Sequence, residues 1–291
     1  MTKIGIVGTG MLGEAVGLHL LDVGYEVNVY NRTKEKTKKL EQKGAKVIES
    51  PKHIAENSDL VIIVVKDAEA VKNVIFGDLG IILGKHDGMC IVDMSTINPN
   101  STKEISKKVS DVGVDYMEIP VMGGPNVAIN GKLVIMASGK KEIFKKYEKI
   151  FNSIAEKTFY LGDTGTAHSI KLAMNLQIAM LALSLSEGLI LSKKAGIDPE
   201  LFLKILNSTY FKTGMSEGKA YKMINNDVVP TFTLANLKKD LDTINDAADS
   251  INTELPMAKT ARKVYSDAIN AGFGDIDYTG IISYIMKLSD K

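Results

Sequence analysis

The chain has 291 residues, of which 45% are hydrophobic and 24% charged, and its formal net charge at pH 7 is +1. This composition is ordinary for a soluble globular protein, and so balanced a charge gives no electrostatic basis for binding nucleic acid or an anionic membrane. At roughly 150 residues per domain, the length predicts two domains.

The single cysteine, Cys90, lies in an apolar run and can form neither a disulfide nor a metal site of paired cysteines. The N-terminal segment enters a strand pattern directly, so we expect no signal peptide. The uncharged apolar stretch from Leu172 to Ser186 is shorter than the ~20 residues that span a bilayer. We therefore expect a soluble cytoplasmic protein with no membrane partner and no bound metal.

Short apolar runs rich in β-branched residues alternate with amphipathic segments up to about residue 160. The runs are KIGIV, YEVNVY, AKVI, LVIIVV, MCIVDM, DYMEI, LVIMAS and TFYL, and the amphipathic segments include 11–23, 33–43 and 99–112. This alternation predicts an α/β fold whose N-terminal part is a doubly wound Rossmann sheet, parallel at least in its first half.

After FYLGDTG, residues 159–165, the strand signal stops and helical patterns follow at roughly 164–195, 198–207, 215–226, 233–250 and 256–271. We predict a dinucleotide-binding domain over 1–162 and an all-helical substrate and oligomerisation domain over 163–291. The first of these helices is long and apolar on most faces, which is typical of a helix at the centre of a domain or between subunits. If the helix lies between subunits, the protein is a homodimer or homotetramer. If it lies at the centre of a domain, it is buried within one subunit.

A glycine-rich turn, GTGMLG, follows the first strand and opens an amphipathic helix. Gly8 permits the tight turn, Gly10 lets the backbone approach a pyrophosphate, and Gly13 lets the helix pack on the strand. Met11 and Leu12 lie between the last two glycines, where the helix N-terminus presents free N–H groups to phosphate. This context predicts dinucleotide binding rather than a glycine-rich turn without a ligand.

The end of the second strand, VYNRT, indicates which dinucleotide binds. NAD-binding proteins usually carry an acidic residue there for the ribose 2′-hydroxyl, but this chain has Asn31, followed by Arg32 and Thr33. A guanidinium can hold a 2′-phosphate that a carboxylate would repel. We therefore predict NADP(H) in preference to NAD(H), with a merely solvated Arg32 as the alternative.

Two later strand ends should line the same crevice, because ligands bind at the carboxyl ends of strands in such folds. One carries Val65 and Lys66, and the other carries Ser95 and Thr96. Ser95 and Thr96 have an alternative interpretation as caps of the helix that begins near Pro99.

The segment SIKLAMNLQIAM, residues 169–180, places Lys171 and Asn175 one turn apart on one face of an otherwise apolar helix. Burying an unpaired ammonium is costly, so a lysine at this position calls for a functional explanation. His168 lies three residues earlier, and we interpret it as a residue of the first helical turn rather than a catalyst.

The motifs GTGMLG, NRT, DMSTI, PVMGGP, GKLVIMASG, GDTGTAHSIKLAMN, FTLANLKKDL and GFGDIDYTGII together resemble the β-hydroxyacid dehydrogenases over essentially the whole chain. Within that family the chain most resembles the NADPH-dependent glyoxylate/succinic semialdehyde reductases. The resemblance implies that Lys171 donates a proton to the substrate carbonyl oxygen and that Asn175 orients the lysine or the substrate. A lysine that extends to solvent, or that forms an inert ion pair with Asp240, is the structural alternative.

The resemblance also assigns residues around the substrate. A loop with Met122, Gly123 and Gly124 should hold the substrate carboxylate together with Ser95, although Met122 stands where many members carry serine. The segment 232–244 implies Lys239 near the nicotinamide, with Phe232 and Asp240 supporting the site.

Together these observations predict an NADPH-dependent reductase of a small carboxylated aldehyde of the succinic semialdehyde or glyoxylate type. Alternatives are a 3-hydroxyisobutyrate dehydrogenase and, from another class, a non-catalytic NADP-binding module. Lys171 counts against that module and against an imine reductase. A 6-phosphogluconate-type enzyme would need a larger helical domain.

Overall fold

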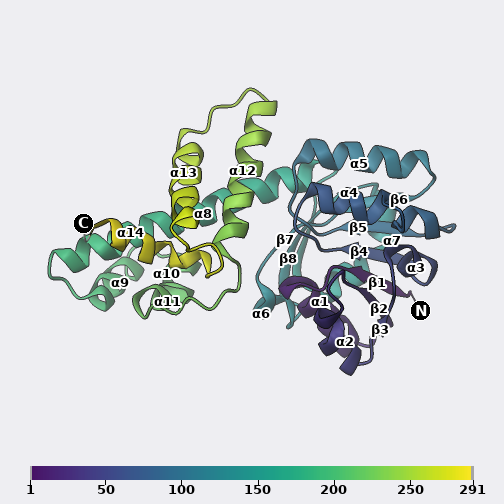
Figure 1. The fold of residues 1–291 in the computed structure, drawn as a ribbon, viewed down its shortest axis with the longest axis horizontal. Coiled ribbons are helices and arrows are strands. Elements are labelled where there is room, and N and C mark those ends of the chain that lie inside the picture. The colour runs from purple at the N-terminus through teal and green to yellow at the C-terminus, as the bar shows by residue number, and fades with distance from the viewer. Residues whose placement is uncertain (1, 290–291) are drawn as a thin grey trace. The chain divides into compact units, whose positions relative to one another are not determined.

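The protein, described here by a computed structural model over residues 2–289, divides into two compact units, Met1–Lys171 and Leu172–Lys291. Helix α8, Thr166–Lys194, runs through this division (Figure 1). The expected domain boundary between residues 162 and 163 stays a prediction.

The first unit contains nine strands and seven complete α-helices within the described residues. The strands are β1 (Ile4–Val7), β2 (Val27–Tyr30), β3 (Lys46–Val47), β4 (Leu60–Ile63), β5 (Cys90–Asp93), β6 (Asp115–Glu118), β7 (Val121–Met122), β8 (Leu133–Gly139) and β9 (Ala155–Tyr160). The helices are α1 (Met11–Asp22), α2 (Lys38–Gln42), α3 (Pro51–Glu56), α4 (Ala68–Phe76), α5 (Pro99–Asp111), α6 (Pro125–Ala128) and α7 (Lys141–Ser153), with 3-10 turns at Lys34–Thr37 and Ile81–Gly84.

The strands form one sheet in the order β3-β2-β1-β4-β5-β6-β8-β7, and β9 pairs with β8. Strands β1 to β6 run parallel to one another, and β8 is antiparallel to β6 and β7. The carboxyl ends of β1, β2, β4, β5 and β6 therefore meet at one edge of the sheet. The chain turns to opposite sides after β1 and β4, and ligands bind at such a switch point. The predicted doubly wound fold is confirmed.

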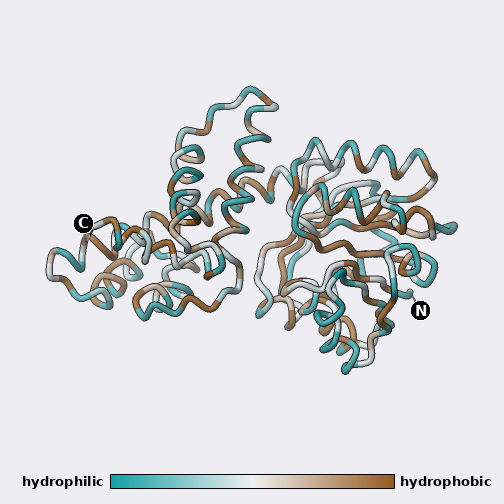
Figure 2. Tube along the Cα trace, viewed as in Figure 1, coloured by the Kyte–Doolittle hydropathy of each residue, from teal (hydrophilic) through white to brown (hydrophobic). Residues whose placement is uncertain are grey.

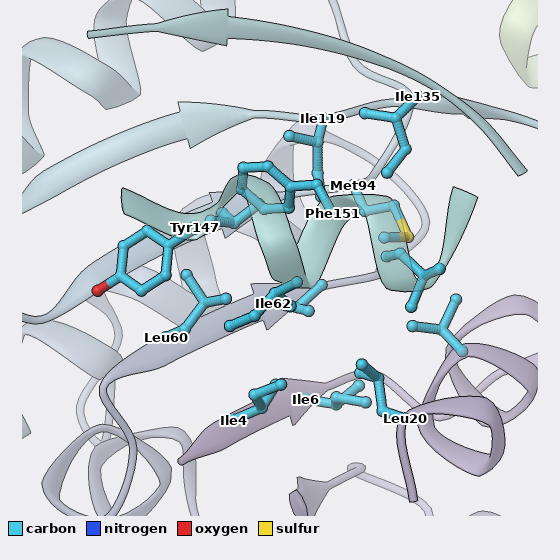
Figure 3. Packing of buried hydrophobic residues seen from close by; sticks show 14 of the residues in the cluster. Ile4, Ile6, Leu20, Leu60, Ile62, Met94, Ile119, Ile135, Tyr147 and Phe151 are labelled. Carbon is cyan, nitrogen blue, oxygen red and sulfur yellow. The ribbon is translucent and has the colours of Figure 1, made fainter. Parts of the chain in front are cut away.

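The central strands are buried on both faces, which explains their nearly continuous apolar sequences. Alternate residues enter separate cores, so that Ile4 and Ile62 belong to one cluster while Val61 and Ile63 belong to the other. Helix α7 covers the first cluster with Tyr147 and Phe151 (Figure 3). The hydropathy of the trace in Figure 2 follows this pattern, with hydrophobic residues along the strands.

The second unit is helical. It contains most of α8 and the elements α9 (Pro199–Asn207), α10 (Gly214–Gly218), α11 (Ala220–Ile224), α12 (Leu234–Ser250), α13 (Pro256–Asn270), α14 (Ile281–Ser289) and a 3-10 turn at Tyr278–Gly280. Buried side chains of α8, α12 and α13 form its core, including Leu189, Leu241 and Tyr265. The predicted all-helical C-terminal part is confirmed.

Two local expectations were wrong. The segment 215–226 is not one helix but α10 and α11, which meet at Lys219, and Gly218 before this junction has low helix propensity. The short strand β7 lies in what we expected to be a loop, where it pairs with β8 through Val121 and Ile135. Met122 is therefore a strand residue, paired with Val134, and the loop with Gly123 and Gly124 begins directly after it.

Helix α8 is the one helix among residues 2–289 that is long and apolar enough to cross a bilayer by length and composition. Central helices of soluble proteins pass the same test, and 39% of the residues in its most apolar part are buried inside the protein. The expectation of no membrane partner stays a prediction.

Candidate active site

The glycine-rich turn after β1 is shaped by close backbone packing. Gly8 has a φ of +102°, and a Cβ atom there would lie 2.1 Å from the carbonyl oxygen of Val64. A Cβ atom on Gly13 would lie 2.0 Å from the carbonyl oxygen of Gly8. At Gly10 a Cβ atom would meet no described atom within 4 Å, so open space lies in front of this residue.

The start of α1 suits a dinucleotide phosphate. Gly10 is the N-cap residue and has no side chain that caps the first N–H groups of the helix. Met11 is exposed and Leu12 is half-buried at the beginning of the helix. The hydroxyl of Thr9 is buried without a hydrogen-bond partner among residues 2–289. Uncapped N–H groups, an open glycine and an unused hydroxyl together fit a pyrophosphate.

The end of β2 carries no acidic side chain. Asn31 accepts a hydrogen bond of 3.0 Å from the backbone N–H of Thr9, and its Nδ2 donates over 2.8 Å to the carbonyl oxygen of Thr33. Asn31 thus ties the glycine-rich turn to the second strand, while Arg32 and Thr33 are exposed beside it. The charged side chain nearest in sequence to the strand end is the Arg32 guanidinium.

The ends of β4 and β5 are joined through Ser95. Its Oγ accepts a hydrogen bond of 3.0 Å from the backbone N–H of Val65, and its own N–H donates over 2.8 Å to Asp93 Oδ1. Helix α5 is capped instead by Asn98, so the alternative that Ser95 or Thr96 caps this helix was wrong. Ser95 is buried, Thr96 is half-buried and Lys66 is exposed.

The predicted substrate loop lies next to the predicted catalytic lysine. Lys171 Nζ donates to the thioether sulfur of Met122 over 3.3 Å, although Lys171 is only 9% exposed. Gly123 has a φ of +121°, and a Cβ atom there would lie 2.9 Å from Leu133 Cδ2. A Cβ atom on Gly124 would meet nothing within 4 Å, which leaves open space in front of the loop.

A buried polar cluster that the sequence analysis did not identify lies beneath the start of α8. The carboxylate of Glu118 accepts hydrogen bonds from the N–H groups of Gly165 at 2.5 Å and of Ala167 and His168 at 3.3 Å. Ser138 Oγ donates to the same carboxylate over 2.5 Å. Glu118 therefore satisfies N–H groups that a helix N-terminus leaves without partners.

His168 completes this cluster and is fully buried. Its Nδ1 is in direct contact with the Glu118 carboxylate and lies 2.8 Å from Thr102 Oγ1, and its Nε2 lies 2.8 Å from the Ser95 carbonyl oxygen. Burial alone would lower the pKa of His168, but Glu118 and Asp93 raise it above its ordinary value. Burial alone would raise the pKa of Glu118, yet His168 and the surrounding donors hold it below its ordinary value.

The sequence contains one signal for the buried cluster around Glu118 and His168, namely acidic residues at the ends of buried strands. Asp93 and Glu118 are the last residues of β5 and β6, and both are fully buried. An unpaired carboxylate is unfavourable in such a position, so each needed a partner that local patterns do not identify. Asp93 accepts from Tyr116 Oη over 3.1 Å, and burial raises its pKa against the opposing effect of His168.

The remaining predicted residues lie in the second unit. Asn175 Nδ2 donates over 2.6 Å to Asp240 Oδ2, and Lys239 Nζ lies 2.5 Å from Asp240 Oδ1. Asn175 and Asp240 are buried, and the Asn175 Oδ1 atom has no hydrogen-bond partner among residues 2–289. Phe232 packs edge-on against Tyr278, with ring centroids 6.0 Å apart. No group of three or more potential metal ligands occurs in the described part of the chain.

Comparison with known protein families identifies the family of this chain. Residues 3–162 match the family described as the NAD binding domain of 6-phosphogluconate dehydrogenase. Residues 165–285 match the family described as NAD-binding of NADP-dependent 3-hydroxyisobutyrate dehydrogenase. The chain belongs to the β-hydroxyacid dehydrogenase family. It is an NAD(P)-dependent oxidoreductase that acts on CH–OH groups.

Curated relatives align with nearly the whole chain. Glyoxylate/succinic semialdehyde reductase 2, chloroplastic, of Arabidopsis thaliana is 31% identical over 99% of this chain and 81% of its own length. Glyoxylate/succinic semialdehyde reductase 1 of the same plant is 30% identical over 97% of this chain and 98% of its own length. Cytokine-like nuclear factor N-PAC of Gallus gallus is 30% identical over 96% of this chain, which spans 50% of that relative.

Solved structures share the fold. A 3-hydroxyisobutyrate dehydrogenase (ygbJ) from Salmonella typhimurium superposes with a TM-score of 0.89 at 24% identity, over 98% of this chain and 100% of that one. A structure described as Psf3 in complex with NADP+ and 2-OPP superposes with a TM-score of 0.91 at 22% identity, over 97% and 99% of the two chains.

Proposed function

We propose that this β-hydroxyacid dehydrogenase reduces a small carboxylated aldehyde, of the succinic semialdehyde or glyoxylate type, with NADPH. The observation that carries the proposal is the buried residue Lys171, whose Nζ lies 3.3 Å from the sulfur of Met122, directly before the glycine-bearing loop. The names of two relatives that match at 30–31% identity support this substrate class.

The bound nicotinamide would supply the hydride, and the protein residues would hold the cofactor and manage the proton. Gly8, Gly10 and Gly13, with the N–H groups of Met11 and Leu12, would hold the pyrophosphate at the start of α1. Val65, Lys66, Thr96 and Lys239 are proposed to line the rest of the cofactor site.

Arg32, with Asn31 and Thr33, supports the preference for NADPH over NADH. The end of β2 has no carboxylate to repel a 2′-phosphate, and the exposed Arg32 can reach one. A neighbour of the same fold is described as containing NADP+, which is compatible with this preference.

Lys171 is proposed to hydrogen-bond the substrate carbonyl oxygen and to donate a proton to it as the oxygen becomes negative. In the reverse direction, neutral lysine accepts the hydroxyl proton. Asp240 fixes the amide of Asn175 through Nδ2, which leaves the Oδ1 atom as an acceptor for the ammonium or for a substrate hydroxyl. Phe232 is proposed to close the apolar side of the substrate site.

The carboxylate of the substrate is proposed to bind the backbone N–H groups of Gly123 and Gly124, where glycine leaves the backbone accessible. Met122 has no strong donor, so Thr96 would supply the side-chain hydrogen bond. Ser95 is proposed to contact the substrate as well, and its hydroxyl, which accepts the Val65 N–H, also fixes the strand ends.

The soluble enzyme is proposed to be a cytoplasmic homodimer or homotetramer. Exposed apolar residues recur along α8, including Ile170, Met174, Leu181 and Leu191, and a second copy of the chain could cover them.

Two other functions have specific support. Matches to 3-hydroxyisobutyrate dehydrogenases favour that activity as the second candidate. A non-catalytic NADP-binding module is the candidate from a different class, and the match to a relative named as a nuclear factor, N-PAC, keeps it open.

Substrate ranking decides among these functions. We would follow NADPH oxidation with succinic semialdehyde, glyoxylate and methylmalonate semialdehyde, and NADP+ reduction with 3-hydroxyisobutyrate. The highest kcat/KM on succinic semialdehyde or glyoxylate supports the proposal. The highest kcat/KM on methylmalonate semialdehyde or 3-hydroxyisobutyrate assigns a 3-hydroxyisobutyrate dehydrogenase instead. NADPH binding with no turnover of any compound would leave the non-catalytic module.

A further inference from the structure

The buried cluster under α8 joins the helix of Lys171 to the strand ends of the first unit. Glu118 ends β6, Ser138 lies beside it in β8, and both accept hydrogen bonds from N–H groups in residues 165–168. His168 contacts Glu118 and the Ser95 carbonyl oxygen on the opposite sides of its ring. The first turn of α8 is therefore held from several strands at once.

The hydrogen-bond partners of His168 define its protonation state. The Ser95 carbonyl oxygen can only accept, so Nε2 must carry a proton. Although Glu118 is buried, the surrounding donors and His168 hold its pKa below the ordinary value, while Glu118 and Asp93 raise the pKa of His168, so the proton between Nδ1 and the carboxylate is assigned to the ring. Thr102 accepts at the same side, because its own hydroxyl donates to the Asn98 carbonyl oxygen over 3.3 Å. The ring is therefore an imidazolium with both N–H groups bonded.

These contacts connect both predicted binding regions. Ser95 accepts a hydrogen bond from His168 through its carbonyl oxygen, and its Oγ accepts the Val65 N–H and so fixes the end of β4. Lys171 lies three residues after His168, about 4.5 Å further along the helix axis, and contacts Met122 of the substrate loop. A rotation or shift of the first turn would move the ammonium relative to that loop.

We propose that His168 is a positioning residue for the reaction: as an imidazolium held between Glu118 and the Ser95 carbonyl oxygen, it fixes where Lys171 presents its ammonium to the Met122 loop. This inference rests on the proposed catalytic role of Lys171. His168 itself touches neither the substrate loop nor the glycine-rich turn in any described contact. Its effect on catalysis therefore passes through α8.

Deprotonation of the ring would loosen this arrangement. The ionisable groups that face His168 are Glu118 from β6 and Asp93 from β5, and Tyr116 donates to Asp93 from the side. Both carboxyl groups favour the imidazolium, so neutral His168 forms only at a pH above its ordinary range. Loss of the charge leaves one ring nitrogen without a proton to donate.

The test uses the full-length protein and His168→Gln, in which the amide can still donate to the Ser95 carbonyl oxygen but carries no charge. His86→Gln is the matched control, because His86 is an exposed histidine of the same unit that also contacts a carbonyl oxygen. The first readout is the rate at which an amine reagent labels Lys171 relative to the exposed lysines, measured by mass spectrometry. The second is kcat and the KM for NADPH.

We expect His168→Gln to change the relative labelling rate of Lys171 and to lower kcat by about 10²-fold, the effect associated with a displacement of about 1 Å. The KM for NADPH should stay within about twofold, since the amide of the new Gln still donates to the Ser95 carbonyl oxygen, and Ser95 still binds the Val65 N–H at the end of β4. His86→Gln should change neither readout. Unchanged labelling and unchanged kcat per folded molecule would overturn the inference, even if the melting temperature falls.

The protonation state is tested in the wild type, so the inference stays falsifiable if the variant does not fold. Nitrogen NMR of the histidine rings should show both His168 nitrogens mostly protonated at pH 6.5, where an ordinary histidine is half neutral, and a ring that is half neutral or more there contradicts it. An active Lys171→Ala enzyme would refute the proposed function, and labelling would still test the positioning. An inactive Lys171→Ala together with a fully active His168→Gln refutes the positioning alone.

Discussion

An Asn31→Asp substitution tests the cofactor preference with little change to the local backbone. The new carboxylate can keep the 3.0 Å bond from the Thr9 N–H, so the glycine-rich turn should stay in place. The substitution removes the 2.8 Å bond that Asn31 donates to the Thr33 carbonyl oxygen. Its main effect is a negative charge at the end of β2, beside Arg32.

The magnitude follows from the charge and the exposure of the site. Two unit charges 4 Å apart interact by about 1 kcal/mol in water and about 4 kcal/mol near a protein surface. Asn31 is half-buried and Arg32 is exposed, so the lower part of this range, about 1–2 kcal/mol, applies. The ratio of kcat/KM for NADPH to that for NADH should therefore fall roughly 5–30-fold.

The assay compares both cofactors at low ionic strength, where exposed charges act most strongly. Arg32→Ala should shift the ratio in the same direction because it removes the proposed partner of the 2′-phosphate. Lys157→Ala removes an exposed lysine from β9 of the same unit and should leave the ratio unchanged. An unchanged ratio in both Asn31→Asp and Arg32→Ala would refute the reasoning.

Three further predictions concern the turn, the buried pair and the loop. Gly13→Ala should lower the melting temperature, since its Cβ atom would lie 2.0 Å from a backbone oxygen. Gly10→Ala should weaken NADPH binding but leave the melting temperature unchanged, since its Cβ atom would enter open space. Glu118→Gln leaves a buried imidazolium unpaired and should cost about 3–5 kcal/mol in urea unfolding at pH 6. Because the pKa of His168 is raised in the folded protein, its contribution to the free energy of unfolding is complete below pH 6.5 and is lost as the pH rises through the pKa of the folded state. A free energy of unfolding that does not fall at alkaline pH would contradict the ion pair. Met122→Ser adds a donor at the proposed carboxylate site and should lower the aldehyde KM several-fold, up to about tenfold for one charge-assisted bond; an unchanged KM removes that site.

Local patterns predicted the elements whose signals are contained within a few residues. Apolar strands and the glycines at 8, 10 and 13 follow from short-range rules, and the sheet order then places the strand ends at one edge. The long helix α8 was expected at 164–195 and occupies Thr166–Lys194. These features need no knowledge of distant contacts.

The buried polar contacts were not predictable in the same way. Glu118 and His168 are 50 positions apart, and no local rule pairs them. The expectation that Ser95 binds substrate stays a prediction, but the hydrogen bond that its hydroxyl accepts from the Val65 N–H joins two strand ends 30 positions apart and follows from no local pattern. The division of 215–226 falls at Lys219, whose Nζ lies 3.2 Å from Asp277 Oδ2, a contact between distant positions that local patterns do not predict.

The central claim is that Lys171 performs the proton transfer in aldehyde reduction. The most direct measurement compares kcat for succinic semialdehyde between wild type and Lys171→Ala, with NADPH affinity measured separately by cofactor fluorescence. Lys193→Ala, which removes an exposed lysine near the end of the same helix, is the matched control. The account predicts a fall in kcat of about 10² or more in Lys171→Ala, with NADPH affinity unchanged and the control fully active. Equal turnover by Lys171→Ala and wild type would contradict it.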